Sequence, residues 1–160
     1  MMLRRSPMRS IAWLCGLLLL LLSACSDGRP CYHHYETVAE EGLDKEDSVV
    51  LVTDSVKEDG SYGVELCLRT SARYPYRFLA LKTRVKVLPD GPELMKNLRF
   101  EVKHDNGANT GEGMIYFTHE QPFAQLALKR GDSLRMVVRH NMRRQVMPGI
   151  VSVGLKVVDN

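Results

Sequence analysis

The sequence lacks the motifs on which most hydrolytic and nucleotide-dependent enzymes rely. It contains no Gly-x-Ser-x-Gly, no His-Glu-x-x-His and no glycine-rich phosphate loop. His33 and His34 are neighbours, and neighbouring side chains of an extended chain point apart, so they are poorly placed to share a metal with Cys31. We therefore predict a protein that is not an enzyme and that holds no metal or cofactor. A hydrolase with dispersed residues would require the fold to bring His140 to an acid.

Aromatic residues and net charge are also scarce. Aromatics make up 7% of the chain and the single tryptophan is Trp13, which disfavours an aromatic platform for glycans. The formal charge of +3 comes from 22 basic and 19 acidic residues. Three of the basic residues lie within the first 24 positions, and the remainder of the chain is balanced at 19 of each sign. Nucleic-acid-binding domains are usually visibly basic, so no nucleic-acid partner is expected.

Long hydrophobic runs are limited to one, Ile11–Leu22, which at twelve residues is too short to span a bilayer comfortably. Arginines precede it, no acid occurs before Asp27, and the small residues Ser23 and Ala24 follow. This order is typical of a signal peptide, residues 1–24. The sequence Leu22-Ser23-Ala24-Cys25 resembles the bacterial lipobox, in which the cysteine is acylated and the chain is cut before it.

Lipidation at Cys25 would set the location of the protein. One acyl chain binds a membrane marginally, whereas two or three hold it almost permanently. No acidic run follows Cys25, so we expect a bacterial cell-envelope protein that is anchored through lipid to the periplasmic face of the outer membrane. Cys15 leaves with the signal, and only Cys31 and Cys67 remain. They are a candidate disulfide in an oxidising compartment, with two free thiols as the alternative.

The mature chain is expected to form one all-β domain. Residues 25–47 are interpreted as a lipidated tether and a loop leading into the domain, and residues 48–160 as the domain itself. Apolar and polar residues alternate with a period of two, most clearly over Leu79–Val87, and turn signals such as Asp59-Gly60 separate the segments. Seven or eight short strands predict a two-sheet antiparallel β-sandwich of jelly-roll or immunoglobulin-like type, with a barrel as the alternative. Residues 93–97 could form one helical turn, and 123–128 a short, weak strand.

Two clusters between strands are candidate partner-binding sites. The first contributes Arg73, Tyr74, Tyr76 and Arg77, and the second contributes Arg139, His140, Met142 and Arg143. Exposed tyrosine and arginine are enriched in binding hot spots, and arginines suit an acidic protein surface or a lipid phosphate. The alternative is that the tyrosine rings cap the core and that the basic loop is merely solvated. The stripe Lys82, Arg84 and Lys86 is interpreted as the solvated face of a strand that protects a sheet edge.

The same clusters carry a resemblance to the gliding-motility-associated lipoprotein H (GldH) family. It rests on an ordered set of short motifs across the mature chain: Gly60-x-Tyr62, Leu68-Arg69, Tyr74-Pro75-Tyr76-x-x-Leu79-x-Leu81, Pro89-Asp90-Gly91, Gly111-x-Gly113, Met142-Arg143 and Met147-Pro148-Gly149-Ile150-x-x-Val153-Gly154-Leu155-Lys156. The resemblance implies an outer-membrane lipoprotein linked to gliding and type IX secretion, without catalysis. The chain departs from the family in having no tryptophan near the central glycines.

These observations lead to a function and an alternative. We expect an accessory or assembly component of a cell-envelope complex that contacts other envelope proteins and reaches the membrane through lipid on Cys25. The alternative is a glycan- or lipid-binding module, because β-sandwiches host many such sites.

Overall fold

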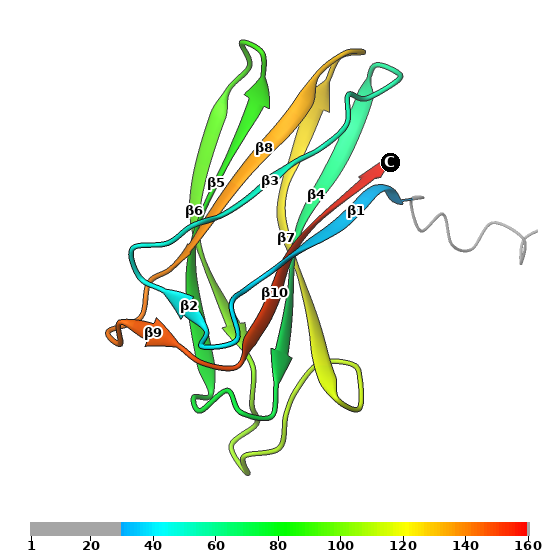
Figure 1. Cartoon of the computed structure of the whole chain (residues 1–160). Coiled ribbons are helices and arrows are strands. Elements are labelled where there is room, and N and C mark those ends of the chain that lie inside the picture. Colours follow the sequence, from blue (N-terminus) through cyan, green and yellow to red (C-terminus); the bar gives the residue numbers. More distant parts are fainter. Residues whose placement is uncertain (1–29, 160) are drawn as a thin grey trace, which may run out of the picture.

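Two four-stranded antiparallel sheets face each other in the computed structural model, which describes residues 30–159 (Figure 1). This confirms the predicted all-β sandwich. The strands are β1 (Pro30–Thr37), β2 (Leu43–Asp44), β3 (Val49–Val52), β4 (Gly60–Ser71), β5 (Phe78–Leu88), β6 (Glu93–Glu101), β7 (Tyr116–Leu128), β8 (Ser133–His140), β9 (Val146–Met147) and β10 (Ile150–Asp159). The described residues include no helix of the length and hydropathy that a membrane crossing requires.

The first sheet has the order β1-β10-β4-β7 and the second the order β3-β8-β5-β6, while β2 and β9 form a small separate ribbon. The strand registers show which strand ends lie together. Pro30 lies opposite Val158 in β10, and this end of the sandwich is called the N-terminal end. Ser71 lies opposite Tyr116 at the other end. The β4–β5 and β6–β7 loops lie at that distal end, and the β8–β9 loop lies at the side of the sandwich next to β2, away from the start of β1 (Figure 1).

The core forms where the inward faces of the two sheets meet. In β5, residues Leu79, Leu81, Val85 and Val87 are almost fully buried, as their alternation predicted. The matching inward residues of β4 and β10 include Leu66, Leu68, Val153 and Leu155, all of them fully buried. Each such side chain contributes about 1.5–3 kcal/mol through removal of apolar surface from water. Burial of both inner faces therefore stabilises the sandwich.

The N-terminal segment differs from the prediction. The tether and loop assigned to residues 25–47 instead contain β1 and β2, and β1 pairs with β10 along its length. This edge strand is exposed or half-buried at every residue, so it lacks the apolar alternation that marks a half-buried strand. Its pairing partner, β10, lies more than a hundred residues away in the sequence, so no local sequence pattern indicates the pairing. Cys25 and the signal segment lie outside the described residues.

Two further expectations are corrected along the chain. Residues 93–97 belong to β6, not to a helical turn, because they continue the pairing with β5. The weak strand predicted at 123–128 is the end of β7, which has thirteen residues and includes Pro122. The β4–β7 register shifts between Val64 and Glu65, beside Pro122, and this irregularity accommodates a residue that cannot donate to the ladder.

Candidate functional site

Tyr74 belongs to the core of the distal end and not to its surface. Its side chain is completely buried, and its hydroxyl donates a hydrogen bond to the Phe78 carbonyl at 2.8 Å. The neighbouring Tyr76 ring meets it edge-on, with centroids 6.1 Å apart, and remains 40% exposed. The alternative that a tyrosine ring caps the core is therefore correct for Tyr74. Of the two rings, Tyr76 is the one that a partner could reach.

Arg77 is held by acids on neighbouring elements. Its guanidinium donates to Glu101 through Nε at 3.0 Å and Nη2 at 2.8 Å, and its Nη1 pairs with Asp105. It also lies over the Phe78 ring, 4.6 Å from the centroid. These contacts connect the β4–β5 loop to β6, so Arg77 positions the loop. Arg73 is exposed on the same loop.

His140 and Met142 of the second cluster form hydrogen bonds with backbone groups. His140 is buried, its Nδ1 accepts a hydrogen bond from the Met142 amide at 3.3 Å, and its Nε2 lies 3.1 Å from the Gln145 carbonyl. This pairing assigns the neutral tautomer with the proton on Nε2. Met142 sulfur accepts from the Ala80 amide at 3.4 Å. Backbone groups thus occupy both ring nitrogens of His140, and the hydrolase interpretation gains no support from this residue.

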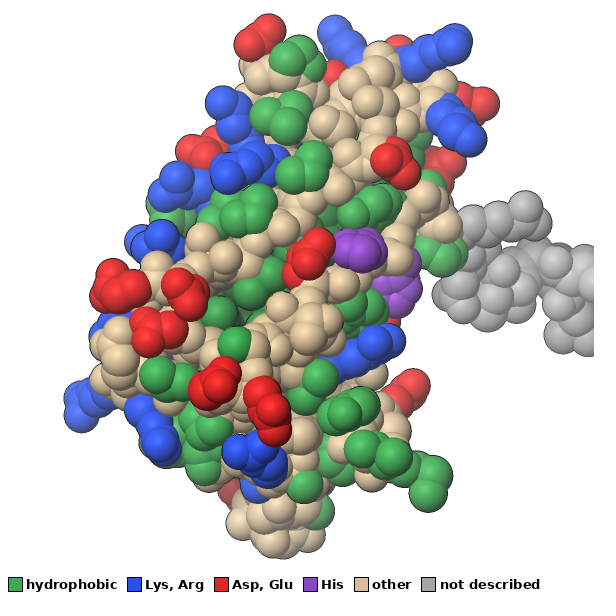
Figure 2. All heavy atoms as spheres, in the orientation of Figure 1, with side chains coloured by type: hydrophobic (Ala, Val, Ile, Leu, Met, Phe, Trp, Pro, Cys, Tyr) green, Lys and Arg blue, Asp and Glu red, His purple; other side chains and the backbone are tan. Residues whose placement is uncertain are grey.

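Several basic side chains gather on the outer face of the second sheet. Lys82 lies directly opposite Arg139, and Lys86 directly opposite Arg135, on the neighbouring strands β5 and β8. All four are exposed, and none forms an ion pair with another described residue. Figure 2 shows Lys and Arg side chains clustered over this sheet. These four residues are called the basic face below, and Arg143 and Arg144 follow in the β8–β9 loop.

The basic face corrects the interpretation of the stripe Lys82, Arg84 and Lys86. β5 lies between β8 and β6 and is a central strand, so its basic stripe does not protect a sheet edge. Like charges directly opposite each other on neighbouring strands are destabilising. The sequence analysis missed the set because residues about fifty positions apart are joined only by the strand register.

An apolar tip on the β6–β7 loop was also missed. Met114, Ile115 and Tyr116 are 95%, 75% and 52% exposed at the distal end. The apolar and aromatic residues of 114–118 predict a strand from the sequence. The strand instead begins at Tyr116 because Gly111 and Gly113 adopt left-handed backbone conformations, with φ of 82° and 136°. They turn the chain outward before it joins the sheet.

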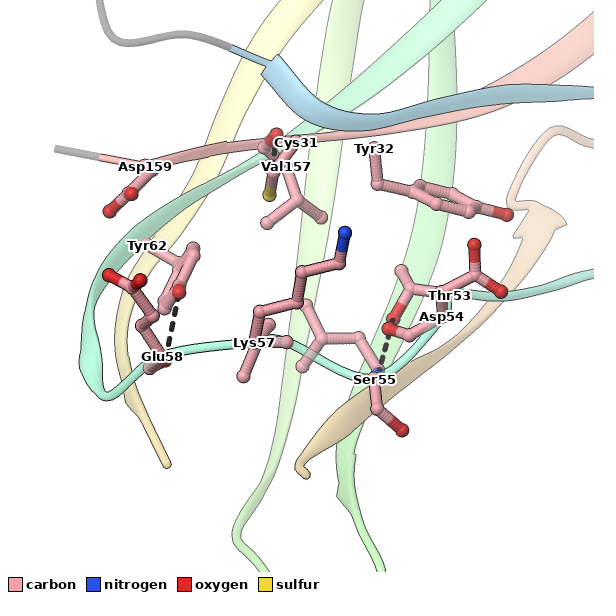
Figure 3. A pocket seen from close by; sticks show the side chains of 12 residues that line it. Cys31, Tyr32, Thr53, Asp54, Ser55, Lys57, Glu58, Tyr62, Val157 and Asp159 are labelled. Atoms are coloured by element: carbon pink, nitrogen blue, oxygen red, sulfur yellow. Dashed lines mark hydrogen bonds between the residues drawn. The ribbon is translucent and has the colours of Figure 1, made fainter. Parts of the chain in front are cut away.

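A cavity of about 500 Å³ opens at the N-terminal end, between β1 and the segment that follows β3 (Figure 3). Tyr32, Tyr62, Lys57 and Asp159 contribute to its lining. The Tyr62 hydroxyl donates to the Glu58 carbonyl at 2.9 Å. No histidine lines this cavity, so it does not bring His140 to an acid.

Cys31 and Cys67 are both free thiols in the structure. Strand β10 separates β1 from β4 and keeps the two cysteines on different strands. Cys31 is exposed, whereas Cys67 is completely buried although it points away from the core. Burial, together with the charge of Glu120, raises the pKa of Cys67 to about 12.

We expect alkylation to distinguish the two thiols. In the folded, chelator-treated protein at neutral to mildly basic pH, iodoacetamide should modify Cys31 and leave Cys67 unmodified, because the thiolate is the nucleophile and must also be accessible. Peptide mass spectrometry measures the result, and labelling in urea, where both should react, is the control. Equal modification of Cys67 in the folded protein would contradict its burial.

The sequence motifs follow one another in order along the strands and loops. A comparison with known families shows to which family the chain belongs. The GldH lipoprotein family profile matches residues 30–157. The chain belongs to the GldH lipoprotein family. Membership makes it a gliding-motility-associated lipoprotein and a lipid-anchored protein of the bacterial envelope. This family is not known for catalysis.

Comparison with other proteins adds only distant likenesses for this GldH-family member. A search of curated proteins gives no match. A family GH115 4-O-methyl-α-glucuronidase specific for decorated arabinogalactans aligns with a TM-score of 0.44 and 14% identity, covering 84% of this chain and 18% of the enzyme. Eiger TNF from S. frugiperda aligns at 0.33 and 12%, covering 80% and 92%. The chain therefore spans under a fifth of the glucuronidase, and TM-scores this low carry no argument about function.

Proposed function

We propose that this lipoprotein is a non-catalytic accessory or assembly component of an envelope complex related to gliding motility and type IX secretion. It would be held by lipid on Cys25 at the periplasmic face of the outer membrane. The observation that carries the proposal is the basic face, in which Lys82 opposes Arg139 and Lys86 opposes Arg135. None of the four forms an ion pair with a described residue, and Glu93, which lies opposite Lys86 on β6, pairs with Arg84 instead. Its partner would be an envelope protein with an acidic surface.

The placement of the other exposed residues supports a protein partner. The described chain begins at the N-terminal end with Pro30, so the predicted anchor at Cys25 lies only a few residues before that end. The β4–β5 and β6–β7 loops, which carry Arg73, Tyr76 and the apolar tip, lie at the distal end, and the β8–β9 loop, which carries Arg143, also lies away from the start of β1 (Figure 1). Tyrosine, methionine and arginine are enriched in protein interfaces. A domain tethered at one end would present these groups toward the periplasm.

Site-specific photo-crosslinking in cells tests the contact surface. A crosslinking residue in place of Tyr76, Arg139 or Arg143 should capture the same envelope protein. A crosslinker in place of Arg130, an exposed residue of the β7–β8 turn at the N-terminal end, is the matched control and should capture none of it. Equal capture from Arg130, or no protein from any of the three positions, would contradict the proposal. Crosslinks to lipid alone would favour the lipid-binding alternative.

Reversing one charge should separate stability from binding. In Arg139→Glu a carboxylate faces Lys82, and replacing a like-charge pair with an opposite-charge pair is expected to raise the free energy of unfolding by about 0.2–1 kcal/mol. The same change should reduce capture of the acidic partner severalfold. Urea unfolding and crosslinking yield measure the two effects, with Arg130→Glu as the control. A variant that loses stability, or that keeps full capture, would argue against the basic face as the contact surface.

A further inference from the structure

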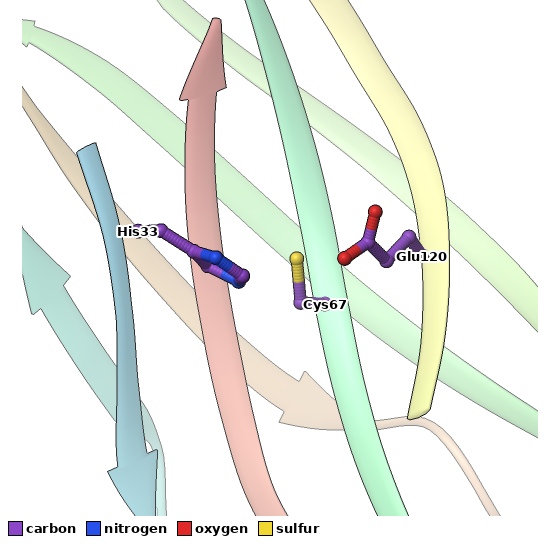
Figure 4. Close-up of side chains that lie close together, drawn as sticks. All are labelled: His33, Cys67 and Glu120. Carbon is purple, nitrogen blue, oxygen red and sulfur yellow. The ribbon is translucent and has the colours of Figure 1, made fainter. Parts of the chain in front are cut away.

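Three potential metal ligands meet on the outer face of the first sheet, on the opposite layer from the basic face. A ring nitrogen of His33, the Cys67 sulfur and a carboxylate oxygen of Glu120 lie within 4.8 Å of one another. They come from β1, β4 and β7, strands that are far apart in the sequence. Figure 4 shows His33 and Glu120 reaching toward Cys67 from opposite sides, with His33 extending across β10.

Gly154 of β10 makes this meeting sterically feasible. It lies opposite Tyr35 of β1 and opposite Cys67 of β4. A Cβ at this position would come within 2.7 Å of the Tyr35 ring and 3.1 Å of the Cys67 Cβ. The missing side chain leaves a depression over β10, and the β1 side chains cover it. Cys67 is buried under these side chains and not within the core.

The groups around the three ligands hold them and balance their charge. Lys156 Nζ lies 2.7 Å from Glu120 Oε2 and 3.1 Å from Glu65 Oε2, so Glu120 is oriented while its other oxygen stays free to coordinate. The Tyr35 hydroxyl is buried beside the Cys67 sulfur without a hydrogen bond of normal geometry, and Arg69 covers the Tyr35 ring at 3.9 Å. A sulfur that became a thiolate would give this hydroxyl an acceptor. Such outer contacts are what metal ligands ordinarily have.

We propose that His33, Cys67 and Glu120 bind one Zn²⁺ ion, with a water molecule as the fourth ligand. Imidazole nitrogen, thiolate sulfur and carboxylate oxygen are the donors that zinc accepts in tetrahedral sites. On binding, the Cys67 S–H bond breaks, the proton passes to solvent and the sulfur electron pair forms the bond to zinc. The Cys67 thiolate, Glu65 and Glu120 together with Lys156 carry a net charge of −2, which Zn²⁺ neutralises.

The geometry needs only a small contraction. Donor atoms of a tetrahedral zinc site are about 3.3–3.8 Å apart, given bonds of about 2.0–2.3 Å. His33 and Glu120 are exposed, so their side chains are free to move inward by the required distance.

Cobalt substitution tests the site directly. The full chain, extracted in mild detergent and stripped with a chelator, is titrated with Co²⁺. We expect binding of about one ion per chain, with a thiolate-to-cobalt charge-transfer absorption and visible bands of tetrahedral cobalt, both abolished by added Zn²⁺. His33→Ala and Glu120→Gln should weaken Co²⁺ binding at least about tenfold, and Cys67→Ala should remove the charge-transfer band.

The chain supplies a matched control for each ligand. Cys31→Ala, His34→Ala and Glu36→Gln change the same residue types nearby and should leave the cobalt spectrum intact. Absence of a sulfur-to-cobalt band in the parent protein, or its persistence in Cys67→Ala, would overturn the proposal. If Cys67→Ala does not fold, His33→Ala decides, because His33 is exposed on an edge strand. An unchanged Co²⁺ affinity in that variant would also overturn it.

Discussion

Replacement of Tyr74 with alanine is expected to lower the free energy of unfolding by about 3–5 kcal/mol, the range for removal of a large buried ring. The ring is completely buried, and its hydroxyl donates to the Phe78 carbonyl at 2.8 Å. Alanine would leave a cavity between the β4–β5 loop and the chain around Gly149, and an unpaired carbonyl beside it. Urea unfolding of the detergent-extracted protein, followed by circular dichroism, measures the loss.

Two further substitutions serve as comparisons for Tyr74→Ala. Tyr74→Phe keeps the ring and removes only the hydrogen bond, so it should cost about 1 kcal/mol. Tyr76→Ala removes a 40% exposed ring at the same loop and should change stability by less than about 1 kcal/mol, while it reduces partner capture. A large loss from Tyr76→Ala, or a negligible one from Tyr74→Ala, would reverse the roles assigned to the two rings.

Replacement of Gly149 with alanine should have the second large effect, a loss of about 3 kcal/mol or more from backbone strain and overpacking together. The residue has a φ of +78°, which side chains rarely adopt, and a Cβ there would lie 2.3 Å from the Tyr74 amide nitrogen. That neighbour is backbone and cannot rotate away. The Gly149 carbonyl also accepts from the Ser71 amide at 2.9 Å, so displacement would break this contact between loops.

Gly131→Ala separates strain from crowding. Gly131 has a φ of +95°, but a Cβ there would meet no atom within 4 Å. Its loss should be limited to the cost of the left-handed conformation, about 1–2 kcal/mol. Thermal or urea unfolding of both variants gives the comparison. Similar losses at the two positions would show that contact with Tyr74 contributes little.

Both large effects concern the packing that supports the proposed contact surface. Tyr74 and Gly149 join the β4–β5 loop to the chain before β10, and Arg77 joins the same loop to β6. These residues are expected to act on partner capture only through the fold. Arg139, Arg143 and Tyr76 are exposed, and changes there are expected to act on capture directly. Comparing stability with crosslinking yield distinguishes the two groups.

Prediction from sequence succeeded where a local pattern carried the information. The alternation over Leu79–Val87 marked a strand with one buried face, and the ordered motifs pointed to the family that the comparison established. It failed for β1, an edge strand with no buried face, which only its pairing with β10 reveals. It also placed Tyr74 and His140 among candidate contacts, although both are buried. A residue in a loop or at the end of a strand gives no local sign of which groups pack over it.

The sequence by itself determined the alternating faces, and hence the all-β class, through the period of two along each strand. It also supplied the charge balance and the predicted lipid anchor. The tertiary structure alone decided which faces meet across strands. Strand pairing brings Lys82 against Arg139, and it brings His33, Cys67 and Glu120 together around Gly154. The physical reason is that register between distant segments is set by burial of the whole core, and no short stretch of the chain encodes it.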